Sequence, residues 1–531
     1  MKKKIAAFVA AAAVFALTGT MGLAAEDSEN IVETSYGKVQ GVNSTDEGYE
    51  NVVQFKGVPY AAPPVGDLRW KPPVDHEKWE DVLVCDTYKE MPMQELGFVE
   101  PSGTDFHNNT APEMSEDCLY LNVWTPAESD KDRLPVFVWY FGGALQWGNT
   151  AEMEFDGERL ARRGIVVVTV NYRLNVFGFL AHPELFEEAP DAPANFGNLD
   201  QQYGLFWTKR NIAAFGGDPD NITIGGQSAG GGSVLTQLNC EGNRGYIQKA
   251  IVESGVFLDP YQERLKLTRE QALEQGKRFF EYLGVRTLEE ARALPAEFIR
   301  DKNDAFGAFW VTIPDGVYQT DTYWNNMAAG RFLDVPILTG YTEDEFLTGP
   351  QASDMEGLKK EAEEKFGERA GEFLRLIREK SGKNEKSFEE VRAAAQIHSV
   401  ELGIRRMHQL LVRSGAKQPM YVYSFGPHIP GWDNPGAFHS VDLWFFFETL
   451  AKCWRPFTGG HYDLARLMCN YWTEFIKKGN PDGRDADGTQ MPAWDAFTEE
   501  APMVMTFCGG AREESLPEDE WMAFLKNNVK G

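Results

Sequence analysis

The sequence predicts an α/β fold, with a mostly parallel central sheet flanked by helices. Segments 134–141 and 164–172 are almost continuously apolar, as strands are when both faces of a parallel sheet are covered. Segment 198–215, which follows them, has the apolar spacing of a helix. Further strands are predicted at 221–225, 249–254, 336–341 and 419–425. Such an alternation of strands and crossover helices is typical of the α/β class.

The elements before this core are predicted in chain order. A hairpin pairs 31–34 with 38–42 around a glycine turn, and a strand at 51–56 follows. A proline-rich connection, 59–73, leads towards segment 116–126, in which alternate residues are apolar as in a strand. We therefore expect additional strands ahead of the central sheet.

Two long, charged helical segments, at about 268–283 and 355–414, interrupt the alternation. Their charge runs are typical of solvated helix faces. Because no linker, repeat or low-complexity tract divides the chain, we interpret both as insertions above the sheet. Residues 26–531 are then expected to form one domain.

The N-terminus predicts an export signal. Three lysines at positions 2–4 precede an apolar run from Ile5 to about Leu23, and two alanines end it at position 25. A charged start, an apolar middle and a small-residue exit are the parts of a cleaved signal peptide. The alternative is an uncleaved anchor, since ~20 apolar residues suffice to span a bilayer. With cleavage, the product is secreted or periplasmic and has no stable membrane insertion.

The chain is strongly acidic, with a formal net charge of −28. Cleavage of residues 1–25 removes three lysines and no acidic residue, which changes this charge to −31. A surface of this sign repels nucleic acid and anionic membranes. Both are therefore excluded as partners.

A candidate nucleophile follows the predicted strand 221–225. The strand leads into Gly226-Gln227-Ser228-Ala229-Gly230, a G-x-S-x-G sequence, and then into small residues that can open a helix. A strand, a tight turn and a helix form the context of a nucleophile elbow, in which only small neighbours tolerate the backbone. We interpret Ser228 as the nucleophile; the alternative is a glycine-rich loop without chemistry.

Two long motifs carry a family resemblance: EDCLYLNVWTP at 116–126 and FGGDPDNITIGGQSAG at 215–230. The chain resembles the type-B carboxylesterases of the α/β-hydrolase superfamily, which include the cholinesterases and the bacterial para-nitrobenzyl esterases, over about residues 30–525. The resemblance implies ester hydrolysis through an acyl-enzyme, with a small ester and water as partners. It implies no metal or organic cofactor, and the sequence has no H-E-x-x-H and no pair of C-x-x-C motifs.

An oxyanion hole is expected at Phe141-Gly142-Gly143-Ala144, which ends a predicted strand where α/β-hydrolases carry an HGGG-type loop. By resemblance, the backbone N–H groups of Gly143, Ala144 and Ala229 stabilise the developing negative charge. The replacements Phe141 and Ala144 remove no N–H group, although Ala144 adds a methyl group to the pocket wall. The alternative is a glycine turn with no catalytic part.

The base and the acid are expected after Ser228. His439 lies in a segment that resembles the family's G-x-x-H loop, so we interpret it as the general base. Its acid maps by resemblance onto Glu345, at the end of strand 335–341. Asp344 stays an alternative because Phe346 replaces the family's glycine.

Two further histidines and one serine complete the candidates near the site. His398 and His408 fall in a helical pattern and are interpreted as surface or packing residues, and Ser254 matches a family position that supports the acid.

The substrate pocket is predicted from aromatic residues near the motifs. Esters of hydrophobic or aromatic acids, including plant hydroxycinnamates, are the expected substrates. Ordinary core filling is the alternative for each aromatic residue taken singly. The candidates are Trp147, Phe309, Trp310, Trp432, Trp444 and the phenylalanines at 445–447.

Two function classes compete with the esterase: a binding or adhesion protein of the same fold that has lost its nucleophile, and a lipase with an apolar lid. The intact Ser228, Glu345 and His439 argue against the first; the insertions leave the second open.

Six cysteines in an exported chain invite disulfides. The family resemblance implies a bridge at Cys118, for which Cys85 is the displaced candidate partner. The other four, expected to be mostly reduced and buried, are Cys240, Cys453, Cys469 and Cys508.

Cleavage of the leader is directly testable. The exported protein should begin near Glu26, because the small residues at 24 and 25 complete the cleavage site. Intact-mass spectrometry of the exported product measures this. A mature product that keeps Met1 would identify the leader as an anchor.

Overall fold

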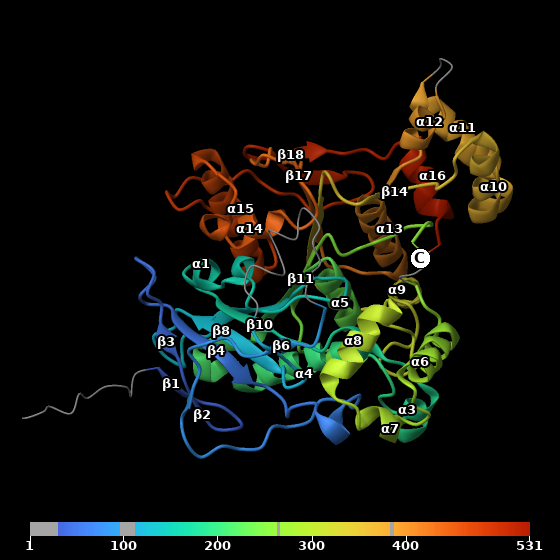
Figure 1. Cartoon of the computed structure of the whole chain (residues 1–531). Helices are drawn as coiled ribbons and strands as arrows, with labels where there is room; N and C mark the ends of the chain where they lie inside the picture. The colour runs from blue at the N-terminus through green and yellow to red at the C-terminus, as the bar shows by residue number, and fades with distance from the viewer. Residues whose placement is uncertain (1–29, 96–111, 263–265, 383–386, 531) are drawn as a thin grey trace, which may run out of the picture.

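An eleven-stranded sheet runs through the chain in the computed structural model, which describes residues 30–95, 112–262, 266–382 and 387–530 (Figure 1). The predicted leader, 1–25, lies outside the described residues. Neighbouring strands follow the order β18-β17-β16-β13-β12-β11-β9-β10-β8-β4-β3.

The centre of the sheet is parallel, which confirms the predicted α/β class. Its strands are β9 (Leu134–Tyr140), β10 (Val166–Val170), β11 (Gly217–Gln227), β12 (Lys249–Glu253), β13 (Ile337–Thr342), β16 (Met420–Phe425) and β17 (Met503–Phe507). Antiparallel pairs extend both edges through β3 (Val42–Asn43), β4 (Val53–Pro59), β8 (Tyr120–Thr125) and β18 (Ala511–Ser515). Because the carboxyl ends of parallel strands meet at one edge, the loops after β11, β12, β13 and β16 come together there.

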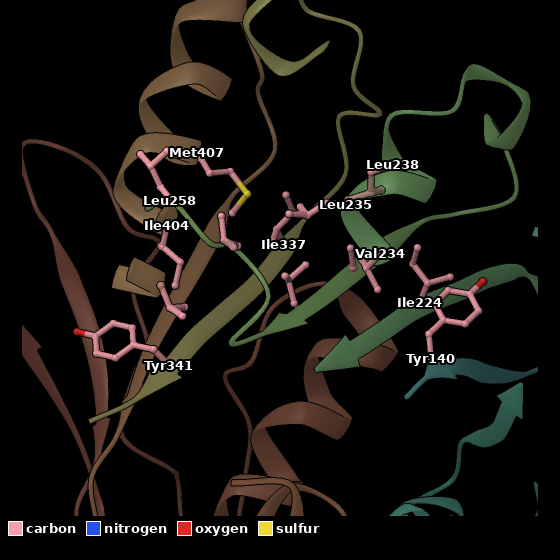
Figure 2. Packing of buried hydrophobic residues seen from close by; sticks show 14 of the residues in the cluster. Tyr140, Ile224, Val234, Leu235, Leu238, Leu258, Ile337, Tyr341, Ile404 and Met407 are labelled. Carbon is pink, nitrogen blue, oxygen red and sulfur yellow. The ribbon is translucent and has the colours of Figure 1, made fainter. Parts of the chain in front are cut away.

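Alternate residues of β9 enter two separate cores. Val136 and Val138 pack in the first, and Phe137 and Trp139 pack in the second. The first core lies under α4 (Phe196–Asn211), α5 (Ala229–Leu238) and α13 (Ser399–Ser414), and part of it is seen in Figure 2. The second lies under α14 (Asp442–Phe446) and α15 (Gly459–Lys478). Coverage on both faces explains why the central strands are apolar throughout.

The N-terminal hairpin forms as predicted, with β1 (Ile31–Glu33) antiparallel to β2 (Lys38–Gln40), and β5 (Leu83–Val84) adds a third strand. Short elements complete this part of the chain and the C-terminus: β6 (Met91–Pro92), β7 (Met114–Ser115), α1 (Glu158–Ala161), α2 (Asn175–Phe179), α3 (Pro183–Glu188) and α16 (Glu520–Asn528).

The first predicted insertion, 268–283, is helix α6 (Arg269–Leu283), and the Thr268 side chain caps its N-terminus. Three further helices follow it: α7 (Leu288–Arg292), α8 (Ala296–Phe306) and α9 (Tyr323–Ala328). The second contains α10 (Met355–Phe366), α11 (Ala370–Ser381) and α12 (Phe388–Ala394), which project from one end of the molecule (Figure 1). The second insertion was predicted to extend to residue 414, and this C-terminal limit is wrong. Helix α13 buries Ile404 and Met407 against the sheet, so it belongs to the layer that covers the sheet.

A short antiparallel pair of β14 (Leu347–Thr348) and β15 (Ile397–His398) closes the base of the second insertion. No helix within the described residues is long and apolar enough to cross a bilayer.

Cys85 and Cys118 are both free thiols, so the expected bridge between them is absent. The two thiols have different surroundings: Cys85 lies near the carbonyl oxygen of Gly57 in β4, whereas Cys118 lies near Arg173 and Asp200. Of the four cysteines expected to be buried, only Cys469 is fully buried. Cys240 and Cys453 are half-buried and Cys508 is exposed.

A buried ion pair fixes α4 to the loop after β10. The Arg173 guanidinium donates to both carboxylate oxygens of Asp200, at 2.7 and 2.8 Å, and the backbone N–H of Arg173 donates to the same group at 3.0 Å. Both side chains are almost fully buried. Loss of either partner would leave an uncompensated charge in the interior.

We therefore expect Asp200→Ala to lower the free energy of unfolding by about 3–5 kcal/mol. Urea unfolding followed by circular dichroism measures the change. The matched control is Glu241→Ala, which removes an exposed partner of Arg244 and should leave the unfolding midpoint almost unchanged. Equal, small shifts in both variants would contradict the argument.

Candidate active site

The chain turns sharply between β11 and α5, and Ser228 occupies the turn. Its φ is 55° and its ψ is −124°, a conformation that costs a non-glycine residue free energy. The backbone N–H of Ser228 donates to the Glu253 carbonyl oxygen at 2.9 Å, which ties the turn to the end of β12. Ser228 is half-buried, whereas Gly226, Gln227 and Gly230 around it are buried.

Glycines are needed in this turn because backbone atoms of neighbouring segments lie too close to leave room for a side chain. A Cβ atom at Gly230 would lie 2.1 Å from the carbonyl oxygen of Tyr140, and one at Gly226 would lie 2.4 Å from the backbone of Gly230. Neither distance is compatible with a side chain. The G-x-S-x-G pattern therefore reflects close packing of the turn against the end of β9.

His439 and Glu345 lie in contact. Nδ1 of His439, on the loop before α14, is 2.5 Å from Oε2 of Glu345, which follows β13. Burial opposes ionisation of Glu345, but the charge of the imidazole and its hydrogen bond outweigh this effect and lower the pKa of Glu345 below its usual value. The buried Ser254 hydroxyl adds a smaller contribution of the same sign.

The alternative acid, Asp344, is exposed and points to backbone. Its Oδ2 accepts a hydrogen bond from the Ala437 N–H at 2.7 Å, and its own N–H donates to the Ala437 carbonyl oxygen at 3.1 Å. Asp344 thus holds the histidine loop against the end of β13, while Glu345 faces the imidazole.

Phe346, which replaces the family's glycine, has no left-handed backbone. Any residue can therefore take this position without rotating the loop. Its half-exposed ring lies 4.6 Å from the His439 ring, centroid to centroid.

Gln227 contacts the other nitrogen of the base. Its Nε2 is 3.2 Å from Nε2 of His439. An amide N–H can donate there only if His439 Nε2 carries a lone pair, which leaves the proton on Nδ1, facing Glu345. Within the described part of the chain, no hydrogen bond joins the Ser228 hydroxyl to His439, and the two residues are linked through Gln227, the neighbour of Ser228. Uncomplexed enzymes often have such long or indirect catalytic contacts.

The predicted oxyanion loop lies directly beside the nucleophile. A Cβ atom at Gly142 would be 3.2 Å from the Cβ atom of Ser228. Gly143, Ala144 and Leu145 all have positive φ, at 93°, 55° and 63°, so the loop coils tightly after β9. The N–H groups of Gln146 and Trp147 close the coil by donating to the Gly143 carbonyl oxygen at 2.8 and 3.0 Å.

Phe141 fixes the start of this loop. Its ring stacks on Tyr172 at a centroid distance of 4.3 Å, and the Tyr172 hydroxyl donates to the Phe141 carbonyl oxygen at 2.6 Å. Ala229, the third predicted donor, is the first residue of α5, where helical N–H groups have no partner within the helix.

The predicted aromatic pocket residues divide into three groups, and one of them is Trp432 alone, which is 88% exposed. Trp147 and Phe309 are half-buried and meet edge to face at 6.2 Å. Trp310 and Trp444 are buried in the second core, so core filling describes them better. The carbonyl oxygen of Trp310 accepts a 2.6 Å hydrogen bond from the Gln146 side chain, which attaches the loop carrying Phe309 to the oxyanion loop.

Two residues near His439 were not singled out from the sequence. Glu253 and Asp442 are buried carboxylic acids, bonded to Trp472 Nε1 at 2.5 Å and to the Tyr423 hydroxyl at 2.7 Å. Burial raises the pKa of Glu253 well above its usual range and that of Asp442 to about 6. Asp442 stands three residues after His439, and only that spacing could have indicated it.

His398, which the sequence placed within a helical pattern, lies just before the helix. It lies in β15 and caps α13, with Nε2 3.1 Å from the Thr342 carbonyl oxygen and its ring 4.8 Å from that of Tyr341. Its positive form helps to lower the pKa of Glu345. His408 is buried inside α13, where it packs on Phe497. Among the described residues, no group of three acidic, histidine or cysteine side chains could hold a metal ion.

Comparison with known proteins decides the family. The model of the carboxylesterase family matches residues 28–521. The chain belongs to this family. It is 33% identical to the para-nitrobenzyl esterase of Bacillus subtilis over 517 residues, which cover 93% of this chain and 98% of that protein. It is also 30% identical to the cholinesterase of Mus musculus, over 90% of this chain and 83% of that protein.

Solved structures of the family agree with this membership. A para-nitrobenzyl esterase superposes with a TM-score of 0.77 at 30% identity, covering 94% of this chain and 99% of the other. A carboxylesterase of Geobacillus stearothermophilus superposes with a TM-score of 0.71 at 30% identity, over 94% of this chain and 100% of the other. The chain therefore has the α/β-hydrolase fold and is a carboxylic ester hydrolase, with a small ester and water as its substrates.

The contacts of the two acidic residues generate a paired prediction. Glu345→Gln should lower turnover by about 10³ to 10⁴-fold, because an amide facing His439 Nδ1 favours the wrong tautomer. Asp344→Asn is the matched control and should change turnover little, because an amide oxygen still accepts from the Ala437 N–H. Turnover is measured on variants of equal fold by circular dichroism. A crippled Asp344→Asn with a mild Glu345→Gln would exchange the two roles.

Proposed function

We propose that Ser228, His439 and Glu345 form the catalytic triad of a secreted serine carboxylesterase. The observation that carries this proposal is the contact of a buried, ionised Glu345 with His439, beside a serine held in a strained turn. Ser228 attacks the ester carbonyl carbon while His439 Nε2 takes its proton. Glu345 keeps the imidazole of His439 in the tautomer whose Nε2 can accept this proton.

The acyl-enzyme then forms and breaks down in two related steps. The alcohol leaves with the proton from His439, and water, activated by the same histidine, releases the acid. The backbone N–H groups of Gly143, Ala144 and Ala229 hold the oxyanion in both steps. The position of the oxyanion loop beside Ser228 supports this assignment.

On the acyl side we infer a preference for hydrophobic or aromatic groups, with hydroxycinnamate esters among the candidates. The support is the edge-to-face pair of Trp147 and Phe309, attached to the oxyanion loop.

The signal peptide and the single mature domain also belong to this proposal. Residues 1–25 direct export and are cleaved, and residues 26–531 form the active enzyme outside the cytoplasm. A cleavable leader is the feature of the sequence that supports this location.

A panel of para-nitrophenyl and feruloyl esters of graded chain length tests the function. We expect hydrolysis of short soluble esters without a detergent interface, and a fall on the order of 10⁶-fold in turnover for Ser228→Ala. Activity only at an interface would favour a lipase. Retention of more than a few per cent of activity by Ser228→Ala, in protein free of host esterases, would remove the nucleophile from the proposal.

A further inference from the structure

The imidazole of His439 has neighbours at both nitrogens and on its ring. Glu345 Oε2 lies 2.5 Å from Nδ1, and the Gln227 side chain lies 3.2 Å from Nε2. The ring of Phe346 lies 4.6 Å from the imidazole, centroid to centroid, with 39° between the two planes. Rings that meet edge to edge cannot come so close, so the Phe346 ring lies partly over the imidazole. The hydrogen bonds of the proposed triad do not account for this contact.

Phe346 contributes little to the folding of its own loop. Its side chain is 53% exposed, so it buries only part of its ring. Its backbone is not left-handed, so the loop would accept almost any residue here. The type-B carboxylesterases that the sequence resembles have glycine at this position. A ring that folding does not require, and that touches the base, is a candidate for a part in the reaction.

Two points of the imidazole are fixed without Phe346. Cγ is bonded to Cβ, and Nδ1 is in hydrogen-bond contact with Glu345. The imidazole can still swing about the line through Cγ and Nδ1, and Nε2, which lies opposite this line in the five-membered ring, moves most. A ring packed over the imidazole limits this swing. Phe257, on the loop after β12, is a second aromatic neighbour of His439, at 6.2 Å.

The position of Nε2 matters because this atom must change partners during the reaction. In the structure it faces the Gln227 amide, and within the described residues it has no hydrogen bond to the Ser228 hydroxyl. During acylation, Nε2 accepts the proton of Ser228 and then donates it to the oxygen of the leaving alcohol. A swing of Nε2 would misdirect both transfers, and a misplacement of about 1 Å can cost ~10²-fold in rate.

The reaction also gives His439 a positive charge. Once Nε2 has taken the Ser228 proton, the side chain is an imidazolium. A cation within ~6 Å of the centroid of an aromatic ring is attracted by the negative face of that ring. The Phe346 ring, at 4.6 Å, is within this limit, whereas the Phe257 ring, at 6.2 Å, is just outside it. At an exposed site this attraction corresponds to about 2 to 5-fold in an equilibrium or a rate.

We propose that Phe346 is a positioning residue for the general base: its ring holds Nε2 of His439 in line for proton transfer and stabilises the imidazolium. The proposal rests on the proposed triad. The proton of Ser228 goes to Nε2 as Oγ bonds to the acyl carbon, and it goes on to the alcohol oxygen as the bond from that oxygen to the carbon breaks. Phe346 gains and loses no atom and acts through His439.

Three substitutions of Phe346 test the proposal. Phe346→Leu keeps an apolar side chain but removes the aromatic face, so kcat should fall about 2 to 5-fold. Phe346→Gly removes the contact as well, so kcat should fall about tenfold or more. Phe346→Tyr keeps the ring and should retain kcat within about twofold. The substrates are the methyl and benzyl esters of the acid hydrolysed fastest in the panel above, and KM should change little for either.

The pH profile of kcat/KM is the measurement that a space-filling role would not change. The ring favours the protonated imidazole, so without it a lower pH is needed to protonate the base. In Phe346→Leu the acid-side midpoint should therefore move down by about 0.3–0.7 pH units.

Other titratable groups lie on the elements around His439: Glu345 and Asp344 after β13, Asp442 in α14, Glu253 in β12 and His398 in β15. Burial raises the pKa of Asp442 to about 6, which is within the range of the acid-side limb. The two profiles are therefore also compared in the Asp442→Asn background. The downward shift should persist there, and its disappearance would assign the shift to Asp442 and overturn the proposal.

The matched control is Phe298→Leu, at a 37% exposed phenylalanine of α8 near Lys302. It should change neither kcat nor the acid-side midpoint. Circular dichroism and thermal unfolding show that all variants are folded. An unshifted midpoint in Phe346→Leu would overturn the proposal, and so would a loss confined to the benzyl ester, because Phe346 would then act on the alcohol. Absence of hydrolysis of every ester by the wild type would instead overturn the proposed function.

Discussion

The turn at Ser228 constrains the rest of the structure. A serine with φ of 55° persists only where its surroundings hold the backbone in place. Here the Glu253 carbonyl oxygen accepts its N–H, and Gly230 packs on the end of β9 so closely that no side chain would fit. The same contact brings the oxyanion loop against the nucleophile. Strand order, glycine positions and the proposed donors are therefore parts of one packing arrangement.

Electrostatics around the imidazole follow from burial. Glu345, Glu253 and Asp442 are buried near one histidine, and three carboxylates there would repel one another strongly. The contact with His439 lowers the pKa of Glu345, whereas burial raises the pKa values of Glu253 and Asp442. One ionised acid thus faces the base and two acids are biased towards the neutral form. This difference in pKa places the negative charge on Glu345, the carboxylate that contacts Nδ1 of His439.

The sequence predicted most of the sheet and the membership of the family, because strands buried on both faces and long motifs are local signals. It misassigned features that depend on distant contacts. Helix α13 has the charged pattern of an insertion, yet tertiary packing of Ile404 and Met407 places it on the sheet. Gln227 was not selected because its amide reaches His439, 212 positions along the chain. Phe346 looked disruptive only because its φ, which needs no glycine, is invisible in sequence.

The two sides of the site are built from parts of the chain under different constraints. The oxyanion loop and the nucleophile are fixed by the parallel strands, and their geometry leaves little freedom to residues 140–147 and 226–230. Helix α12 projects with α10 and α11 from one end of the molecule (Figure 1). Loops and insertions can change without altering the scaffold that holds the reacting groups. The second insertion can therefore vary without moving the strands that hold Ser228 and residues 141–147.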